Sequence, residues 1–478
     1  MLFSSLVFLS GFLPAVLLIY YVFLRGRRKA QNVFLLLASL GFYAWGEPWF
    51  VFVMMLSIIG NWIFGLLVDR YRTYKFRAKS VITISLVFNL GIIFIFKYLM
   101  FTVSNVNKLF GTSISCGKII LPIGISFFTF QAISYVIDIY RQRGEVQKNP
   151  LNVGLYISFF PQLIAGPIVR YQTVAKQINN RTETFQDFSE GVKRFITGFG
   201  KKILIANNVA LIANYSFNLG SDNRSVAFAW LGALAYTLQI YFDFSGYSDM
   251  AIGLGKMFGF HFMENFDYPY ISKSCSEFWR RWHISLGSWF RDYVYIPLGG
   301  SRVNGKKRLI FNLLIVWFLT GLWHGANWTF ICWGLLYFIF ISVEKLSGFE
   351  KKGNSVLAAS FKHIYTMFLV VMGWVIFRAV NINVAIDYIK TMFVPSKAGV
   401  IDEIFKLYIS EYGIFIIAGL IFSLPVAKKI SESFNKKIKW EESYPTAFLY
   451  GIVMILIMLV SISYLVKGAY NPFIYFNF

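Results

Sequence analysis

Long apolar runs separated by short charged loops dominate the pattern of this 478-residue chain. A helix that crosses a bilayer needs about 20 mainly apolar residues. Runs near that length lie at 5–24, 31–46, 49–68, 80–101, 119–139, 194–218, 226–260, 309–322, 324–343, 360–379, 411–427 and 445–467. The pattern therefore predicts an all-α polytopic membrane protein with roughly 11–12 transmembrane helices.

The charge of the connecting loops predicts the orientation of these helices. Residues 25–29, 69–79 and 141–148 are densely basic, whereas residues 102–118 are only weakly so. Basic loops stay in the cytoplasm, and strict alternation of the first five spans places all three there. The basic loop 428–440 is placed there too, so the last span leads outward. Both termini are thus predicted to be extracytoplasmic, with an uncleaved first span, because its basic residues follow the apolar run.

Composition narrows the classes of function. Only 14% of the residues are charged, and 46 Lys and Arg against 23 Asp and Glu give a net charge of +23. Because the basic residues occupy short loops between apolar runs, topology and anionic lipid headgroups explain the excess better than nucleic acid, which is not an expected partner. Three scattered cysteines argue against a disulfide framework, and neither they nor the four histidines have metal-ligand spacing. No metal site is expected.

His324 lies within the apolar stretch FLTGLWHGANWTFICWGLLYFIF, where a group that can become charged is costly and usually functional. Gly321 and Gly325 allow close approach of another backbone, and two indoles flank the imidazole. Burial disfavours imidazolium and leaves a neutral ring that can accept a proton from a hydroxyl. His324 is therefore the candidate general base. The structural alternative is a neutral interior histidine that hydrogen-bonds a neighbouring helix.

The stretch SEFWRRWHISLGSWFRDYVYIPLGGSR (276–302) combines basic residues with an apolar stripe. The stripe recurs at helical spacing and consists of Phe278, Trp282, Leu286 and Trp289. This spacing predicts an amphipathic helix at the cytoplasmic interface, with its arginines in the headgroup region. His283 lies beside the stripe and is a candidate to face a cavity. Arginine is common at membrane interfaces and is not specific evidence by itself. The candidates to bind a phosphorylated donor such as coenzyme A are Arg280, Arg281 and Trp282.

Two other stretches interrupt the apolar pattern. Asp243 and Asp249 fall within or at the edge of an apolar run, where acidic groups need partners or a wet cavity. The favoured interpretation is a kinked helix whose aspartates pair with arginine or cap backbone, and the lining of a transport pathway is the alternative. The stretch LYISFFPQLIAGPIVRYQ holds two prolines and a glycine, which predicts a broken or re-entrant segment buried against protein.

Three long stretches, YFDFSGYSDMAIGLG, FWRRWHISLGSWFRDYVYIPLGG and GLWHGANWTFICWG, resemble the membrane-bound O-acyltransferase (MBOAT) family. Within it they resemble the bacterial branch that acetylates alginate or peptidoglycan, and ILPIGISFFTFQAISYVIDIYR and PQLIAGPIVR extend the likeness over essentially the whole chain. The resemblance implies a ring of tilted transmembrane helices around a thinned centre, with cytoplasmic and extracytoplasmic funnels. It also implies that His324 is the catalytic histidine and His283 the second, more variable active-site position.

The chain ends in FIYFNF, residues 473–478. An aromatic anchor at headgroup level is the structural interpretation. The ending also resembles the F-x-Y-x-x-F tail of this branch, which implies that Tyr475 carries the acyl group transiently outside. A phenol, with a pKa of about 10, can attack a thioester with the help of a base, and the aryl ester keeps a good leaving group. Two parts are predicted: a transmembrane core, 1–444, and a final helix with its aromatic tail, 445–478.

Together these features predict a membrane O-acetyltransferase of the bacterial cytoplasmic membrane. No tightly bound cofactor is expected, and the donor substrate would be acetyl-coenzyme A or another acyl thioester. The resemblance implies an extracytoplasmic SGNH-type partner that completes transfer to a polysaccharide, so contact of this chain with the glycan need not be direct; its other partner is membrane lipid. Two alternatives stay open: D-alanyl transfer toward teichoic acid, and a transporter or flippase without acyl-transfer chemistry, although no inverted repeat is seen.

Overall fold

The computed structural model describes residues 1–351, 355–426, 428–430, 432–433 and 444–468. Over these residues the regular structure is helical, and β-pairing is limited to one isolated bridge between Ser396 and Gly399. The all-α prediction is therefore confirmed. The chain divides into two compact units, residues Met1–Phe195 with Ser248–Met263 and residues Ile196–Tyr247 with Glu264–Phe478.

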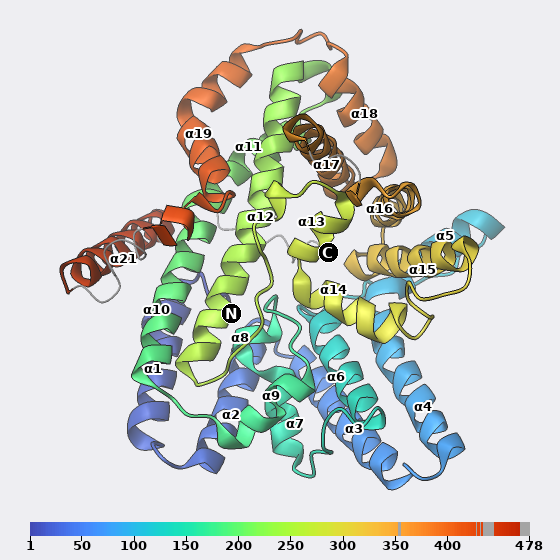
Figure 1. The fold of residues 1–478 in the computed structure, drawn as a ribbon, viewed down its shortest axis with the longest axis vertical. Helices are drawn as coiled ribbons and strands as arrows, with labels where there is room; N and C mark the ends of the chain where they lie inside the picture. Colours follow the sequence, from blue (N-terminus) through green and yellow to red (C-terminus); the bar gives the residue numbers. More distant parts are fainter. Residues whose placement is uncertain (352–354, 427, 431, 434–443, 469–478) are drawn as a thin grey trace. The chain divides into compact units, whose positions relative to one another are not determined.

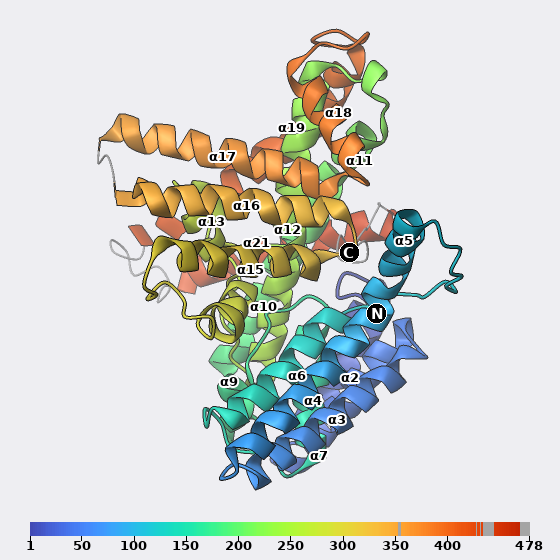
Figure 2. The ribbon, with the colours of Figure 1, turned by 90° about the vertical axis from the view of Figure 1, so that its right-hand side faces the viewer.

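The first unit is a bundle of apolar helices in which α3, α4 and α6 pack against one another (Figures 1 and 2). A short helical stretch of three segments opens the chain: η1 (Phe8–Phe12), α1 (Leu13–Leu18) and η2 (Ile19–Phe23). The helices that follow are α2 (Arg28–Gly46), α3 (Phe50–Arg70), α4 (Lys75–Ile93) continued by η3 (Phe94–Tyr98) and α5 (Leu99–Phe110), α6 (Ile125–Tyr140), α7 (Pro150–Ser158), α8 (Phe160–Leu163), α9 (Tyr171–Asn180) and most of α10 (Phe185–Gly200).

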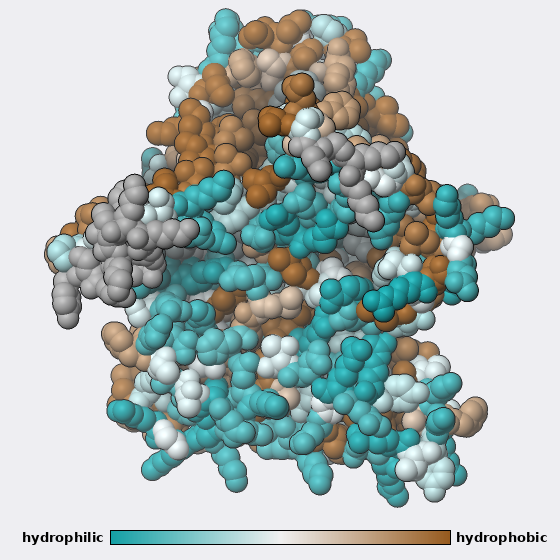
Figure 3. Space-filling view, in the orientation of Figure 1, coloured by the Kyte–Doolittle hydropathy of each residue, from teal (hydrophilic) through white to brown (hydrophobic). Residues whose placement is uncertain are grey.

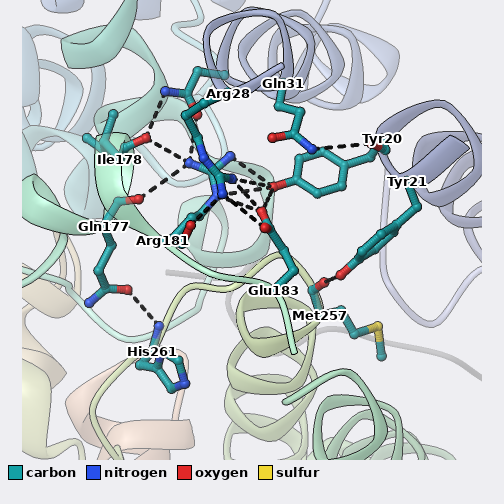
Figure 4. Close-up of polar contacts among 11 residues, drawn as sticks. Tyr20, Tyr21, Arg28, Gln31, Gln177, Ile178, Arg181, Glu183, Met257 and His261 are labelled. Carbon is teal, nitrogen blue, oxygen red and sulfur yellow. Dashed lines mark hydrogen bonds and ion pairs between the residues drawn. The ribbon is translucent and has the colours of Figure 1, made fainter. Parts of the chain in front are cut away.

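A partly buried ion-pair network ties the start of α2 to the chain between α9 and α10 (Figure 4). Glu183 accepts hydrogen bonds from Arg28 and Tyr20, and the fully buried Arg181 side chain donates to Asn32 Oδ1 at 2.7 Å. Although burial acts in the opposite direction, the hydrogen bonds from Arg28 and Tyr20 lower the pKa of Glu183 below its ordinary value. Arg28, counted as a basic loop residue in the sequence, is thus committed to a structural contact.

The broken segment predicted within 150–170 is present. Helix α7 ends at Ser158, the next residue has extended backbone, and the four-residue helix α8 follows. Gly166 allows the chain to fold back on itself, because a Cβ at this position would lie 2.5 Å from the Cα of Gln162. The segment is buried from Val153 to Val169, as expected for irregular backbone at membrane depth.

The second unit holds two of the three stretches singled out from the sequence and the beginning of the other, YFDFSGYSDMAIGLG, whose residues from Ser248 on belong to the first unit. Its helices are η4 (Lys201–Ala206), α11 (Asn207–Asn218), η5 (Ser221–Asn223), the larger part of α12 (Val226–Met257), η6 (Pro269–Ile271), α13 (Cys275–Arg281), α14 (Ile284–Phe290), η7 (Arg291–Tyr295), α15 (Lys306–His324), α16 (Trp328–Ser347), η8 (Phe349–Lys351), α17 (Val356–Arg378), α18 (Ile382–Phe393), α19 (Glu403–Phe422) and α21 (Tyr444–Val466). Helices α15, α16 and α17 lie side by side in Figure 2, with α16 in the middle. Their core is rich in tryptophan and tyrosine.

Seven helices of the described residues are long and apolar enough to cross a membrane, so the chain is a multi-pass membrane protein. They are Phe50–Arg70, Lys75–Phe110, Phe185–Asn218, Trp328–Ser347, Val356–Arg378, Glu403–Phe422 and Pro445–Val466. Other runs counted as crossings from the sequence, such as 31–46 and 309–322, also fold as helices, α2 and α15, of 19 residues each. Figure 3 shows apolar side chains gathered over α19, where Ile414 and Ile417 are exposed, which indicates a lipid-facing surface.

Candidate active site

His324 is the last residue of α15, and two glycines fix its position against α16. A Cβ on Gly321 would lie 2.5 Å from the carbonyl oxygen of Phe330, and a Cβ on Gly334 would lie 2.5 Å from that of Trp317. The two helices therefore touch backbone to backbone, as the sequence predicts for Gly321. The end of α15, and with it the imidazole, is set by this contact.

Aromatic rings surround the imidazole of His324, which is 7% exposed. Its centroid lies 5.0 Å from those of Trp333 and Phe377, both edge-on, and 4.8 Å from that of Trp323. Phe330 lies 6.4 Å away on the side of the α15–α16 turn. A low-dielectric cage of this kind favours the neutral imidazole, the form that a general base requires.

His283 also lies in the second unit, at the interruption between helices α13 and α14. The predicted continuous amphipathic helix over 276–302 is wrong, because α13 ends at Arg281 and α14 starts at Ile284. His283 stands between them with a φ of 45°, in the left-handed region, which no ordinary helix contains. The apolar stripe itself is confirmed, since its four members are all buried.

The conformation of His283 is held by a segment from elsewhere in the chain. Asn265 accepts hydrogen bonds from the backbone and the hydroxyl of Ser285 and lies 3.2 Å from His283 Nδ1, and its carbonyl accepts from the N–H of Ile284. Burial lowers the pKa of His283 to about 3, so this ring is neutral. Trp323 contacts both imidazoles, with centroids 5.8 Å from His283 and 4.8 Å from His324. One indole thus joins the two candidate histidines.

A cavity of 380 Å³ opens beside His283 and is here named the tryptophan cavity. Its aromatic walls include Trp279, Trp282 and Trp317. Three of its lining residues are basic, Arg280, Arg291 and Lys345, and the described lining contains no acidic residue. An apolar pocket with a few cationic groups suits a ligand that has an apolar reactive end and a phosphate-bearing carrier.

The candidate donor-side residues have different places. Trp282 is buried and lines the tryptophan cavity, and the exposed Arg280 lines it while pairing with Glu350 at 2.8 Å. Arg281 pairs instead with Asp267 and Glu277, at 2.9 and 3.0 Å. Arg281 therefore holds the Asn265 segment to α13 and is a positioning residue.

A second cavity, of 730 Å³, lies near His324 and is here named the arginine cavity. It is lined by Phe330 and Phe377, the rings that contact the imidazole, and by Arg224, Arg378 and Asp387 among others. On the tryptophan-cavity side, Trp333 touches His324 and also the cavity walls Trp279 and Trp317. Phe330 and Phe377 thus lie between His324 and the arginine cavity, whereas Trp333 and then Trp279 or Trp317 lie between His324 and the tryptophan cavity.

Both aspartates of α12 are ion-paired. Asp243 lies 2.6 Å from Lys202 in the second unit, and each side chain is 2% exposed. Asp249 lies 2.7 Å from Arg194 in the first unit. Helix α12 runs without interruption from Val226 to Met257. The predicted pairing of an aspartate with arginine is therefore present at Asp249, whereas Asp243 pairs with a lysine.

Sequence reasoning missed several residues of these cavities. Lys345 and Arg378 close apolar runs and resemble ordinary interfacial anchors in the sequence, although a cation at the end of a span was a usable signal. Asn265 gave no such signal in the sequence, because its role depends on a contact with a residue 18 positions away. Tyr475 lies outside the described residues.

This all-helical membrane domain holds a buried histidine in a cage of aromatic rings near two cavities, an arrangement that fits the class of membrane-embedded acyltransferases. Residues 146–385 match the membrane-bound O-acyltransferase family, and the chain belongs to it and is an acyltransferase. It is 46% identical over 398 residues to a Pseudomonas syringae pv. tomato protein named "Probable alginate O-acetylase AlgI", covering 82% of this chain and 75% of that one.

Two further relatives extend this similarity. The Pseudomonas putida protein of the same name is 40% identical over 498 residues, which covers 100% of both chains. The peptidoglycan O-acetyltransferase of Helicobacter pylori is 35% identical over 426 residues, covering 82% of this chain and 80% of the relative. The family resemblance predicted from the three long stretches is therefore confirmed.

The buried Glu344 of α16 is expected to hold helix α13, which forms part of the wall of the tryptophan cavity. Its carboxylate accepts from the backbone N–H groups of Cys275 and Ser276, at 2.7 and 3.0 Å, at the start of α13. Glu344→Gln removes the charge from this helix end, so we expect a loss of about 1–3 kcal/mol in unfolding free energy. Because α13 carries Trp279 and Arg280, the KM for the acyl donor should rise more than kcat falls.

Thermal unfolding in detergent, together with donor-dependent kinetics, checks this expectation. Glu403→Gln is the matched control, because Glu403 is an exposed residue at the start of α19, 87% exposed, and should change neither quantity. An unfolding midpoint and a donor KM that both stay at wild-type values in Glu344→Gln would contradict the positioning role.

Proposed function

We propose that this chain takes an acetyl group from a cytoplasmic acyl thioester and delivers it to the outer face of the bacterial cytoplasmic membrane, for O-acetylation of a polysaccharide such as alginate or peptidoglycan. The observation that carries the proposal is the position of His324, in a cage of aromatic rings that lead to two cavities. Similarity to relatives named for O-acetylation supports the acetyl group and the polysaccharide class.

The tryptophan cavity is the proposed donor side. Arg280, Arg291 and Lys345 can bind the phosphates of acetyl-coenzyme A or a similar carrier, while the indoles surround the thioester end. His283 is neutral and buried, so it shapes this side without adding charge. The basic start of α15 supports a cytoplasmic location, since Lys306, Lys307 and Arg308 form its first turn.

The proposed chemistry at His324 is general base catalysis. The neutral imidazole takes the proton of the attacking hydroxyl as its oxygen bonds to the thioester carbonyl carbon. The C–S bond then breaks, and the leaving thiolate recovers the proton from the imidazolium. The product is an oxygen ester and a free thiol, so atoms and charge balance without a further reactant.

We propose Tyr475 as the hydroxyl that receives the group, and a separate extracytoplasmic SGNH-type transferase as the partner that passes it to the glycan. In this proposal residues 1–444 form the catalytic core and residues 445–478 supply the last helix and the tail. Both termini lie outside, as the basic loops favour. Transfer through the protein lets the acyl fragment cross without its carrier.

Mass spectrometry of the C-terminal peptide tests the relay. After incubation with labelled acetyl-coenzyme A in the absence of a partner, Tyr475 should gain the mass of one acetyl group, and Tyr475→Phe should gain none. The mass of an alanyl group would indicate D-alanyl transfer instead. An unmodified tail in active wild-type protein would rule out the tyrosine carrier, and uptake of an intact carrier without any adduct would favour a transporter.

A further inference from the structure

A third pocket of the second unit, of 540 Å³, adjoins the arginine cavity and is here named the tyrosine pocket. Its lining consists of Leu211, Asn214, Tyr215, Asn218, Arg378, Tyr408 and Tyr412. Asn218 and Arg378 line both this pocket and the arginine cavity. We propose that the tyrosine pocket is a saccharide subsite that binds a carboxylate-bearing sugar residue of the acceptor polysaccharide directly. The inference deepens the proposed function and rests on it.

Three phenol rings form a ladder along one wall of the pocket. Tyr215 and Tyr408 stack with centroids 5.1 Å apart and planes inclined by 26°, and Tyr408 stacks on Tyr412 at 5.7 Å and 28°. Each tyrosine offers an apolar ring and a hydroxyl at its tip. A sugar ring has the complementary character, because its C–H faces pack on aromatic rings while its hydroxyl groups form hydrogen bonds at the edge.

The polar groups of the pocket match such a ligand. Asn214 and Asn218 supply amides that both donate and accept hydrogen bonds. Arg378 contacts the Asn214 side chain and lies over the rings of Phe217 and Tyr236, with 5.8 and 5.4 Å between the guanidinium carbon and the ring centroids. The ion pairs of the described residues include no carboxylate bound to Arg378. A planar guanidinium held in this way is suited to a ligand carboxylate.

The location of the pocket favours a glycan over a cytoplasmic ligand. Asn214 and Asn218 belong to the last turns of α11, Arg378 ends α17, and Tyr408 lies in the second turn of α19. The basic loop before α15 lies at the opposite end of the helix that leads to His324. The orientation predicted from the basic loops places the ends that form the pocket outside the membrane. A subsite here would hold the polysaccharide at the outer face, where the partner transferase passes the acetyl group to it.

A binding experiment with purified protein in lipid nanodiscs tests the subsite. The probe is a tetrameric β-linked oligouronate, and a neutral gluco-oligosaccharide of the same length is the comparison. Saturation-transfer NMR and calorimetry should detect binding of the oligouronate, weakened about tenfold or more by Tyr408→Ala, which corresponds to about 1.4 kcal/mol. Tyr408→Phe keeps the ring and should retain most of the affinity. Arg378→Gln should abolish the preference for the charged oligosaccharide.

Leu407→Ala is the matched control, because Leu407 is an exposed neighbour on the same helix and does not line the pocket. It should bind like the wild type. Wild-type protein that binds neither oligosaccharide, or Tyr408→Ala that binds as tightly as Leu407→Ala, would overturn the subsite and leave the tyrosines as interfacial anchors. Competition by anionic lipid alone, without oligouronate binding, would overturn it in favour of a headgroup site.

The result is separable from the proposed function. His324→Gln should abolish acetyl transfer and retain oligouronate binding, because His324 does not belong to the tyrosine pocket. Active wild-type protein without saccharide binding would refute the subsite alone. Saccharide binding by a chain that transfers no acetyl group from any thioester would refute the proposed function alone.

Discussion

Replacing His324 with glutamine is expected to lower acetyl transfer between about a hundredfold and ten-thousandfold, the usual contribution of a positioned general base. Glutamine is polar and of similar length, and it fits the ring cage better than a charged substitute. It cannot accept a proton from a hydroxyl at neutral pH, so the attack on the thioester loses its base. The measurement is the rate of label transfer from an acetyl thioester to the protein, at equal expression.

The control is His261→Gln. His261 is half-exposed and pairs with Asp187 at 2.9 Å in the first unit, so its loss should leave the transfer rate within about twofold of wild type. A His324→Gln protein that transfers acetyl at the wild-type rate would show that the imidazole takes no part in the reaction. The caged histidine would then be a structural residue.

Gly334→Val is expected to have an effect of similar size by a different route. The new Cβ would lie 2.5 Å from the carbonyl oxygen of Trp317 and 3.3 Å from the Cα of Gly321, both on α15. Backbone cannot yield as the end of a flexible side chain can, so α15 and α16 must separate. We expect a loss on the order of 3 kcal/mol in unfolding free energy, together with loss of activity, because the end of α15 carries His324.

Thermal unfolding followed by size-exclusion chromatography in detergent checks this expectation. Gly451→Val in α21 is the matched control, because no atom lies within 4 Å of the added Cβ, and it should unfold at the wild-type temperature. A Gly334→Val protein as stable and as active as Gly451→Val would show that the close approach of α15 and α16 does not set the site.

Residues whose roles follow from periodicity or local chemistry were accessible from the sequence. The stripe that includes Phe278 and Trp289 is buried as its spacing predicts, and Gly321 makes the close contact expected of a glycine in an apolar helix. His324 stood out because an imidazole in an apolar run has few structural explanations. These features depend on one helix at a time.

The break at His283 was not accessible, because its cause lies outside the helix. Helical spacing continues through residues 282–284, so the pattern alone predicts an unbroken helix. Asn265 overrides that preference by hydrogen-bonding the backbone on the far side of the break. The cavity residues Lys345 and Arg378 escaped for a similar reason, because only the packing of several helices brings them to a common surface.

The edge-on rings around His324 have a consequence for the energised membrane. A bacterium that stores energy as a proton gradient cannot keep an open aqueous channel through its bilayer, and a catalyst serving both faces is a potential leak. Trp333 and Phe377 lie 5.0 Å from the imidazole and 5.2 Å from each other, so the three rings form one packed cluster. If an acetyl group crosses the membrane here, as proposed, this cluster must exclude hydrated ions while the smaller fragment passes.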